Sequence, residues 1–391
     1  MIIFALIRQM SGIYIHIPFC RKKCLYCDFY SGGLRIANWD AYISAVLNEL
    51  IIRQNELKNN PSTLYIGGGT PSLIPEQYFI NLINGLCTIL KIDAWKEFTV
   101  EANPEDINDS KIKIWIDAGV TRISLGVQSL NDEELKFIGR NHDAKTAINA
   151  IQALSKHFNN ISLDLMYGLP GQTIESYTRT LATILDFQPS HISSYSLMLE
   201  EGTAMNLLVS KNNILLPDEE SWLQMNQCTN EFLTDRGYHH YEISNYCRPG
   251  FESKHNSIYW EGQPYLGLGP GAHSYDGFNI RKINPGDIKG YINFYSGITL
   301  KDKTGDKKPF YSEENLTEKE LKEEMIMTRL RTAKGLNTAE FEYKFGTDQK
   351  NYLLQKARKY IDLNFLKEIN DNLILTPAGI NISNSIILDL V

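Results

Sequence analysis

The feature that most limits the fold of this chain is a repeated alternation of short apolar strands with amphipathic helices. Residues Ile13 to Ile17 alternate in polarity as a strand does, and residues Asn38 to Leu57 have the periodicity of a helix. Further strands are predicted at residues 63–66, 97–101, 122–126, 161–166 and 191–196, with helical stretches between them that include 76–90 and 110–118. Strands joined through helices form a parallel sheet with right-handed crossovers. The sequence therefore predicts an α/β fold, either doubly wound or an incomplete (β/α)6 barrel.

Polar residues and glycines gather where these predicted strands end. A cysteine loop beginning at Cys20 follows the first strand, and the run Gly67-Gly68-Gly69 follows the second. Glu101, Gln128 and Asp164 lie at or just beyond the ends of three later strands. The carboxyl ends of parallel strands meet at one edge of the sheet, where binding and catalysis collect. A shared site at that edge is predicted.

The size of the chain leaves room for a second, smaller domain. With 391 residues, of which 43% are hydrophobic, it can form one domain of roughly 250 to 300 residues and a small one. The composition shifts at the charged segment 301–309, which is typical of a connector. We expect a first domain over residues 1–300 and a small winged-helix-like α+β domain over 310–391. Its predicted helices span 317–330, 338–345 and 349–363, and a strand pair ends at 373–376.

The charge and the apolar patterning exclude several classes of protein. A net charge of -7 and a pI near 5.7 give no overall attraction to nucleic acid, so no nucleic-acid partner is expected. No apolar run approaches the roughly 20 residues that cross a bilayer, and Met1 to Ile7 lacks a basic leader and a cleavage site. We expect a cytoplasmic protein with at most peripheral membrane contact.

Three of the six cysteines lie within eight residues, at Cys20, Cys24 and Cys27. This C-x3-C-x2-C spacing does not match a zinc site, which needs two close pairs of ligands. A 4Fe-4S cluster normally takes four thiolates, so three leave one iron open to a ligand that is not protein. The amino and carboxylate groups of S-adenosylmethionine can bind that iron, where an electron from the cluster can break a carbon-sulfur bond. The alternative is that the thiols are free or bind zinc with a distant fourth ligand.

The glycine run supports this hypothesis only in combination with the cysteines. Glycine runs often mark tight turns, and the lysine of a phosphate-binding loop is absent from Gly67-Gly68-Gly69-Thr70. Beside an iron-sulfur cofactor, however, glycines allow the backbone to approach the amino-acid end of a bound nucleoside closely.

At this point the sequence resembles a known family. The segment 14–20 with the two further cysteines is similar to the radical S-adenosylmethionine group that contains the oxygen-independent coproporphyrinogen III oxidase. Later landmarks of that group recur at 67–71, 101–104, 126–129 and 164–170, so the resemblance spans nearly the whole chain. It implies that Cys20, Cys24 and Cys27 hold the cluster. It also implies S-adenosylmethionine contacts from Tyr14, Tyr26, Gly68, Gly69, Thr70, Glu101, Gln128, Arg140 and Asp164.

One position separates two branches of this group. The oxidases carry another cysteine two residues after the third cluster cysteine, whereas this chain has Phe29 there. It therefore resembles the HemW haem chaperones, whose motif ends C-x-F and whose H-N-x-x-Y-W motif recurs here at residues 255–260. That resemblance implies a haem region formed by His255, Asn256, Tyr259 and Trp260.

From the residues alone the haem assignment is weak, because a single histidine among aromatic side chains is more often a packed or capping residue. His273 and the pair His239-His240 lie in the same part of the chain and remain alternatives as the iron ligand. Cys228 and Cys247 are expected to be inert thiols, because neither lies in an electropositive setting.

The resemblance implies a protein that binds haem and delivers it to apo-haemoproteins such as respiratory cytochromes, with no catalytic residue assigned. The first alternative is an enzyme, the coproporphyrinogen III oxidase itself. The second is radical chemistry on an unrelated small substrate, with His255 only structural. The sequence is compatible with cleavage of S-adenosylmethionine or with binding alone, and with a homodimer. Met10 is an alternative start, with residues 1–9 as an extension.

Overall fold

The computed structural model describes residues 11–57, 60–211, 214–296 and 309–391. The proposed extension 1–9 and nearly all of the expected connector 301–309 lie outside the described residues.

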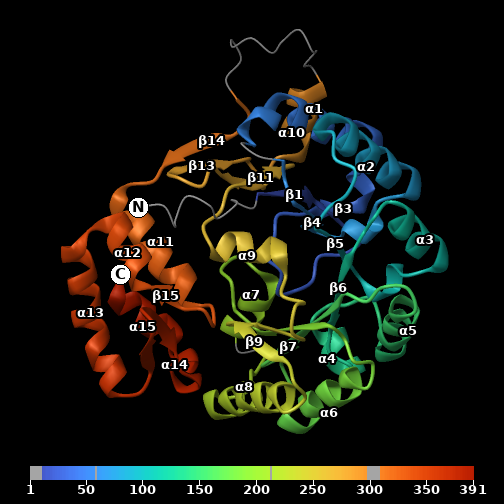
Figure 1. Cartoon of the computed structure of the whole chain (residues 1–391). Helices are drawn as coiled ribbons and strands as arrows, with labels where there is room; N and C mark the ends of the chain where they lie inside the picture. Colours follow the sequence, from blue (N-terminus) through green and yellow to red (C-terminus); the bar gives the residue numbers. More distant parts are fainter. Residues whose placement is uncertain (1–10, 58–59, 212–213, 297–308) are drawn as a thin grey trace.

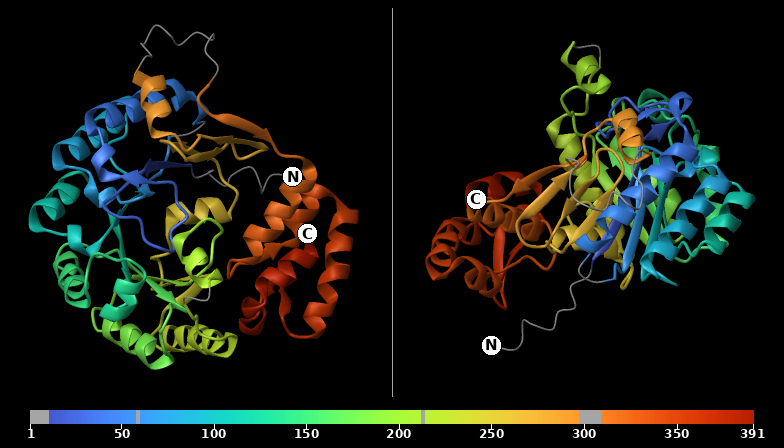
Figure 2. Two further views of the ribbon diagram at one scale, coloured as in Figure 1. Left: turned by 180° about the vertical axis from the view of Figure 1, so that it is seen from behind. Right: turned by 90° about the horizontal axis from the view of Figure 1, so that it is seen from above.

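Six parallel strands form the centre of the fold, as the alternation predicts. They lie side by side in the order of the chain, with helices on the outer face of the curved sheet (Figures 1 and 2). The strands are β1 (Gly12–Ile17), β4 (Thr63–Gly68), β5 (Glu97–Ala102), β6 (Arg122–Gln128), β7 (Ile161–Tyr167) and β8 (His191–Ser196). The helices after them are α1 (Trp39–Arg53), α2 (Glu76–Leu90), α3 (Asp109–Asp117), α4 (Asp132–Phe137), α5 (Ala144–Ser155) and α6 (Ile174–Leu185).

Local sequence explains where the helices begin. Asn38, Asn108, Asp143 and Thr173 are N-caps whose side chains accept hydrogen bonds from the first turns of α1, α3, α5 and α6. On β1, Ile13, Ile15 and Ile17 are fully buried. Alternate positions on a strand point to opposite faces, so Tyr14 and His16 face the interior of the curved sheet. The apolar core thus lies between the sheet and its helices, and polar side chains line the inside.

The sheet does not close, because further strands extend it at both edges. Beside β1 lies β11 (Tyr265–Leu268), parallel to it with Gly12 opposite Tyr265, followed by the antiparallel strands β12 (His273–Tyr275), β13 (Ile280–Ile283) and β14 (Ser312–Asn315). At the other edge, β10 (Asn245–Cys247) and β9 (His239–Glu242) follow β8. The incomplete six-unit barrel is confirmed as an open sheet, which has twelve strands in the part of the chain that the structure describes.

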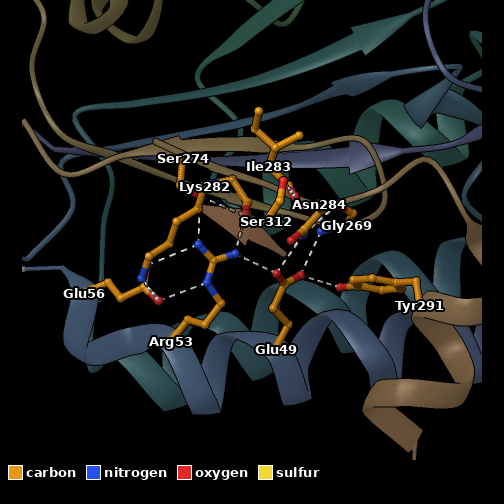
Figure 3. Close-up of polar contacts among 11 residues, drawn as sticks. Glu49, Arg53, Glu56, Gly269, Ser274, Lys282, Ile283, Asn284, Tyr291 and Ser312 are labelled. Atoms are coloured by element: carbon orange, nitrogen blue, oxygen red, sulfur yellow. Dashed lines mark hydrogen bonds and ion pairs between the residues drawn. The ribbon is translucent and has the colours of Figure 1, made fainter. Parts of the chain in front are cut away.

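Helix α1 holds the added strands β11 to β14 through buried charges (Figure 3). Glu49 is fully buried and accepts hydrogen bonds from Arg53, Asn284 and Tyr291. Arg53 also donates to Ser274 on β12 at 2.9 Å, and Lys282 on β13 forms an ion pair with Glu56 at 3.0 Å. A buried charge is tolerated only when its partners satisfy it, so these bonds fix α1 against one face of the added strands.

The remaining elements connect or follow this sheet. They are β2 (Phe19–Cys20), β3 (Gly32–Gly33), α7 (Ala204–Ser210), α8 (Glu219–Thr234), α9 (Lys254–Trp260) and α10 (Ile288–Ser296).

The C-terminal part contains α11 (Glu318–Leu330), β15 (Leu336–Asn337), α12 (Thr338–Phe345), α13 (Thr347–Asp362), β16 (Leu366–Ile369), β17 (Asn372–Leu375), α14 (Pro377–Asn381) and α15 (Ser383–Leu390). These elements surround an apolar core of their own. The expected strand pair is β16 and β17, and β15 adds a third strand. Residues 312–315, which the prediction assigns to this domain, pair with β13 in the large sheet.

Within the described residues, no helix combines the length and the apolar character needed to cross a membrane.

Candidate functional site

The cysteine loop lies at the carboxyl end of β1, where the sequence predicts it. Cys20 is buried, Cys24 and Cys27 are half-buried, and all three are free thiols. The Thr70 hydroxyl donates to Cys20 Sγ at 3.4 Å, and Arg140 Nη1 donates to Cys24 Sγ at 3.7 Å. The loop after β4 and the segment after α4 therefore both reach the cysteines.

Gly69, the last glycine of the run, packs so closely against the cysteine loop that no side chain fits there. A Cβ atom at position 69 would lie 2.8 Å from the carbonyl oxygens of Ile17 and Phe19 and 3.0 Å from Cys20 Sγ. Any side chain there would displace the backbone that carries the first cysteine. Gly69 is thus needed for the position of Cys20, which the sequence alone did not show.

The three thiols fit an iron-sulfur cluster better than a single metal ion. No group of three or more His, Cys, Asp or Glu side chains among the described residues could hold one ion. In a four-iron cluster the thiolates bind different irons, so the sulfur atoms need not converge on one point. Burial raises the pKa of Cys27 to about 11, with smaller contributions from neighbouring groups. A bound metal would stabilise the thiolate instead.

Glu101 lies at the end of β5, beside the glycine run. Its carboxylate accepts hydrogen bonds from the Tyr65 hydroxyl at 2.7 Å and from the Gly68 amide at 3.0 Å. Burial raises the pKa of Glu101 to about 7, and the nearby Asp164 also raises it. A cationic ligand such as an ammonium group would favour the ionised form.

Asp164 points into the same interior from β7. It accepts hydrogen bonds from Ser124 at 3.0 Å and from Ser162 at 3.1 Å, and burial raises its pKa. Carboxylate oxygens have more acceptor positions than these two hydroxyls fill. Asp164 can therefore still accept from the hydroxyl groups of a ligand.

Two further residues complete this edge: Gln128, the last residue of β6, and Arg140, which follows α4. Arg140 Nη2 donates to Asn103 at 2.7 Å and to the Gly126 carbonyl at 2.6 Å, while its buried Nε has no partner among the described residues. Gln128 has a φ of 66° at an irregularity in the register between β6 and β7. An unusual backbone conformation of this kind is often found at binding sites.

The two predicted tyrosines lie at this edge, in the case of Tyr26, and on the inner face of β1 next to it, in the case of Tyr14. The Tyr14 hydroxyl is 3.0 Å from His16 Nδ1, and burial raises the pKa of Tyr14 well above its usual value. Tyr26 lies between the second and third cysteines, and burial raises its pKa as well. We call this edge, formed by the carboxyl ends of β1, β4, β5, β6 and β7 and the loops after them, the mouth. Of the nine residues predicted to contact S-adenosylmethionine, Tyr14 and Asp164 lie midway along β1 and β7 on the inner face of the sheet, and the other seven lie at the mouth; that they bind it stays a prediction.

Two residues of the mouth were missed. Asn103 fixes Arg140, and Tyr65 fixes Glu101. Asn103 belongs to the segment 101–104 that carries the resemblance, and Tyr65 lies on β4 two residues from Thr63, on the inward side. Strand alternation would have found Tyr65, whereas the Asn103 contact depends on tertiary structure.

The predicted haem region lies at the opposite end of the sheet. Helix α9 begins beside the first residues of β4 and β5, where Glu97 accepts the amide hydrogens of Lys254 and His255, both at 2.9 Å. We call α9 and the residues that contact it at this end the floor. Mouth and floor thus lie toward opposite ends of the strands, and Tyr65 connects them: its ring centroid is 5.1 Å from that of His255, and its hydroxyl donates to Glu101.

His255 is held inside the floor rather than presented to a ligand. Its side chain is 0% exposed, with Nδ1 2.8 Å from Thr63 Oγ1 and Nε2 2.8 Å from the Tyr259 hydroxyl. Burial lowers the pKa of His255 to about 3. In this conformation neither ring nitrogen is free to bind iron. Asn256, Tyr259 and Trp260 are half-buried, so part of this helix is accessible.

A cavity of about 570 Å³ lies elsewhere, between α8, β9 and the C-terminal part of the chain. Its lining includes His240, Glu242 and Arg331, and burial raises the pKa of Glu242 to about 8. His240, one of the alternative iron ligands, is part of this lining, whereas the residues predicted to bind the cluster, S-adenosylmethionine or haem are not.

Comparison with known proteins shows the family of this chain. Residues 14–184 match the model of the radical SAM superfamily, and residues 316–382 match the HemN C-terminal domain. A protein of Lactococcus lactis named heme chaperone HemW is 34% identical over 97% of this chain and 97% of its own length. A Bacillus subtilis protein of the same name is 38% identical over 86% of this chain and 87% of its own. This chain belongs to the HemW family.

The solved structure of an enzyme shares the fold of this HemW family member. Coproporphyrinogen III oxidase (HemN) from Escherichia coli, described as a radical SAM enzyme, superposes with a TM-score of 0.80 at 22% identity. The match covers 98% of this chain and 90% of the oxidase. It establishes the common architecture, and the radical SAM family implies a 4Fe-4S cluster and S-adenosylmethionine.

Proposed function

We propose that this protein is a haem carrier that binds haem and passes it to apo-haemoproteins, such as respiratory cytochromes, in the cytoplasm. The relatives named heme chaperone HemW, which match most of the chain, support this function. The observation that carries it within the chain is Phe29, which stands where the oxidases have a further cysteine and has a 62% exposed side chain. Membrane contact would be peripheral.

The mouth is proposed to hold both cofactors. Cys20, Cys24 and Cys27 would bind three irons of the cluster, and Thr70 and Arg140, which already contact two of these sulfur atoms, would stabilise the thiolates. A cluster held by three thiolates leaves one iron for S-adenosylmethionine, and the reduced cluster supplies the electron that can cleave that ligand.

The other mouth residues have distinct roles in this proposal. Glu101 would hold the ammonium group of S-adenosylmethionine, and Asp164 would accept from its ribose hydroxyls. Arg140 would bind the carboxylate, for which its unpartnered Nε is the available donor. Tyr14, Tyr26, Gly68, Gly69, Thr70 and Gln128 would line the same ligand.

We also propose that the chain divides into residues 1–300, with the sheet and the haem region, and residues 310–391. The separate apolar core of the C-terminal elements supports this division, whereas β14 attaches the first residues of the second part to the large sheet.

The experiment that tests the function is an anaerobic transfer assay. The cluster-loaded protein is loaded with haem, freed of excess haem and mixed with an apo-cytochrome, and the spectrum of the holo-cytochrome is followed. We expect transfer, and no decarboxylation of coproporphyrinogen III by the same preparation with S-adenosylmethionine and a reductant. Decarboxylation without haem transfer would instead establish the oxidase, whose fold this chain shares.

A further inference from the structure

A haem iron needs an accessible side chain as its axial ligand, and neutral imidazole is the commonest one. The chain has eight histidines, and all of them lie in the part that the structure describes. Five have a ring nitrogen at hydrogen-bond distance from another group: His16, His142, His191, His240 and His255. The other three, His157, His239 and His273, are exposed.

The three exposed histidines differ in their surroundings. His157 follows α5 in the outer helical layer, and His239 begins the edge strand β9; neither has an aromatic ring contact among the described residues. His273 begins β12, and within the described residues no hydrogen bond reaches its ring. His273 is followed on its own face of β12 by Tyr275, whose ring lies near Tyr265. His239 is likewise followed by Tyr241, but the Tyr241 hydroxyl is already at hydrogen-bond distance from the buried His191.

The direction of the His273 side chain follows from the contacts of its neighbours. Ser274 accepts from Arg53 on α1, and Lys282 on the paired strand β13 binds Glu56 beyond α1 (Figure 3). Alternate residues of a strand point to opposite faces. His273 and Tyr275 therefore project away from α1, onto the inner face of the added strands. Arg281, opposite Tyr275 on β13, projects to the same side and binds Glu324 of α11 at 2.6 Å.

A row of tyrosine rings connects this face to the floor helix. The Tyr259 ring on α9 meets the Tyr265 ring on β11 edge to face, with centroids 4.7 Å apart. Tyr265 in turn lies 6.5 Å from Tyr275 on β12. All three side chains are partly exposed, so this aromatic face is accessible beside His273. Flat aromatic surface next to a free imidazole is the chemistry that a porphyrin requires.

We propose that His273 is the axial ligand of the haem iron and that the porphyrin lies against Tyr265 and Tyr275, rather than being held by His255. This inference rests on the proposed function. Burial and the nearby Arg281 lower the pKa of His273, which keeps its imidazole neutral and able to bind metal near pH 7. Arg281 uses Nη2 for Glu324 and keeps further N–H donors for a carboxylate group of the porphyrin.

The test is an anaerobic haem titration of the cluster-loaded protein, followed by the Soret band. Wild type is compared with His273→Ala and with the matched control His239→Ala, which removes another exposed histidine. We expect roughly tenfold or greater weakening of haem binding in His273→Ala, with loss of the axial-ligand shift of the Soret band, and no change in the control. Added imidazole should restore the shift in His273→Ala, which a merely structural role would not predict.

Two results would overturn the assignment while leaving the proposed function intact. One is a His273→Ala protein that titrates as the wild type does, and the other is loss of the shift in His239→Ala. A wild-type protein without any saturable change in the Soret band would instead refute the proposed function, and the assignment with it.

Discussion

The mouth and the floor of the sheet both carry residues that are typical of this family. The polar groups of His255 at the floor are bonded within the protein, whereas one donor at the mouth has no partner among the described residues. At the floor, both ring nitrogens and the backbone amide of His255 have partners inside the protein. At the mouth, the three thiols form no disulfide, and Arg140 Nε has no partner within the described residues. A motif residue whose hydrogen bonds are all satisfied within the protein therefore supports the fold, whereas polar groups that lack a partner at the carboxyl ends of the strands are available to a ligand.

Arg122 at the floor is an exception, because it also has donors without a partner among the described residues. Arg122, the first residue of β6, is 1% exposed, and its Nε and Nη1 have no partner among the described residues. Desolvation disfavours its charge, while the carboxylate of Glu97 stabilises it and gives a net rise in the pKa of Arg122. Glu97 also holds the start of α9. Arg122 thus stabilises the floor through charge, and a buried water would fit its free donors.

The largest effect is expected at the mouth from Cys24→Ser. Loss of one of three thiolates should abolish the brown cluster absorbance after anaerobic reconstitution, because a serine hydroxyl is a poor ligand for iron. Iron and sulfide content are measured beside Cys87→Ser, which removes a thiol on α2 and should reconstitute normally. Full iron and sulfide in Cys24→Ser would refute the three-thiolate assignment.

The next largest effect is a loss of stability at the floor. His255→Ala should lower the free energy of unfolding by about 3 kcal/mol, because it leaves a cavity and removes the partners of Thr63 and Tyr259. Urea denaturation gives the value, with the exposed His157→Ala as the control. The affinity of the cluster-loaded variant for S-adenosylmethionine should be unchanged. A stable His255→Ala protein that no longer binds haem would break the comparison.

Asp164→Asn is expected to lower the affinity for S-adenosylmethionine without disturbing the fold. Removing the charged acceptor should weaken S-adenosylmethionine binding by about 2 kcal/mol, or roughly 30-fold, while cluster content stays the same. Calorimetry on cluster-loaded protein measures this, with Asp186→Asn at an exposed position as the control. Equal affinities in the two variants would show that the nucleoside lies elsewhere.

The smallest effect concerns the pH dependence of the protein without ligand. Since burial raises the pKa of Glu101 from 4.5 to about 7, the folded state holds this proton where the unfolded state has lost it. Stability should therefore fall as the pH rises between these two values, and Glu101→Gln should reduce that slope. Asp164 and Glu242 act in the same direction, and because Asp164 is coupled to Glu101, the difference between the two proteins reports Glu101 together with this coupling. Parallel curves would contradict this assignment.

Strand periodicity predicted the six central strands and the edge at which the site lies. His191–Ser196 is the clearest case, because the structure has the same bounds. Strands β9 to β14 were not predicted, since each is only three or four residues long and carries little periodicity of its own. Those beside β1 are held by buried charges on α1 such as Glu49 and Arg53, whose partners lie more than two hundred residues away.

The candidate site could be predicted for the mouth because parallel strands bring their carboxyl ends together whatever the details of packing. The burial of His255 could not be predicted, because it results from Thr63 and Glu97 at the start of two distant strands. The motif singled out residues 255–260, whose contact with haem stays a prediction, but tertiary contacts determine which of their atoms are free.

The central claim, that the mouth binds the ligand while the floor is structural, is tested most directly by hydrogen exchange. The cluster-loaded protein is compared with and without S-adenosylmethionine under anaerobic conditions. We predict slower exchange of the backbone amides at residues 67–70 and 126–128, and unchanged exchange at residues 254–260. Protection of 254–260, or none at the glycine run, would contradict the account.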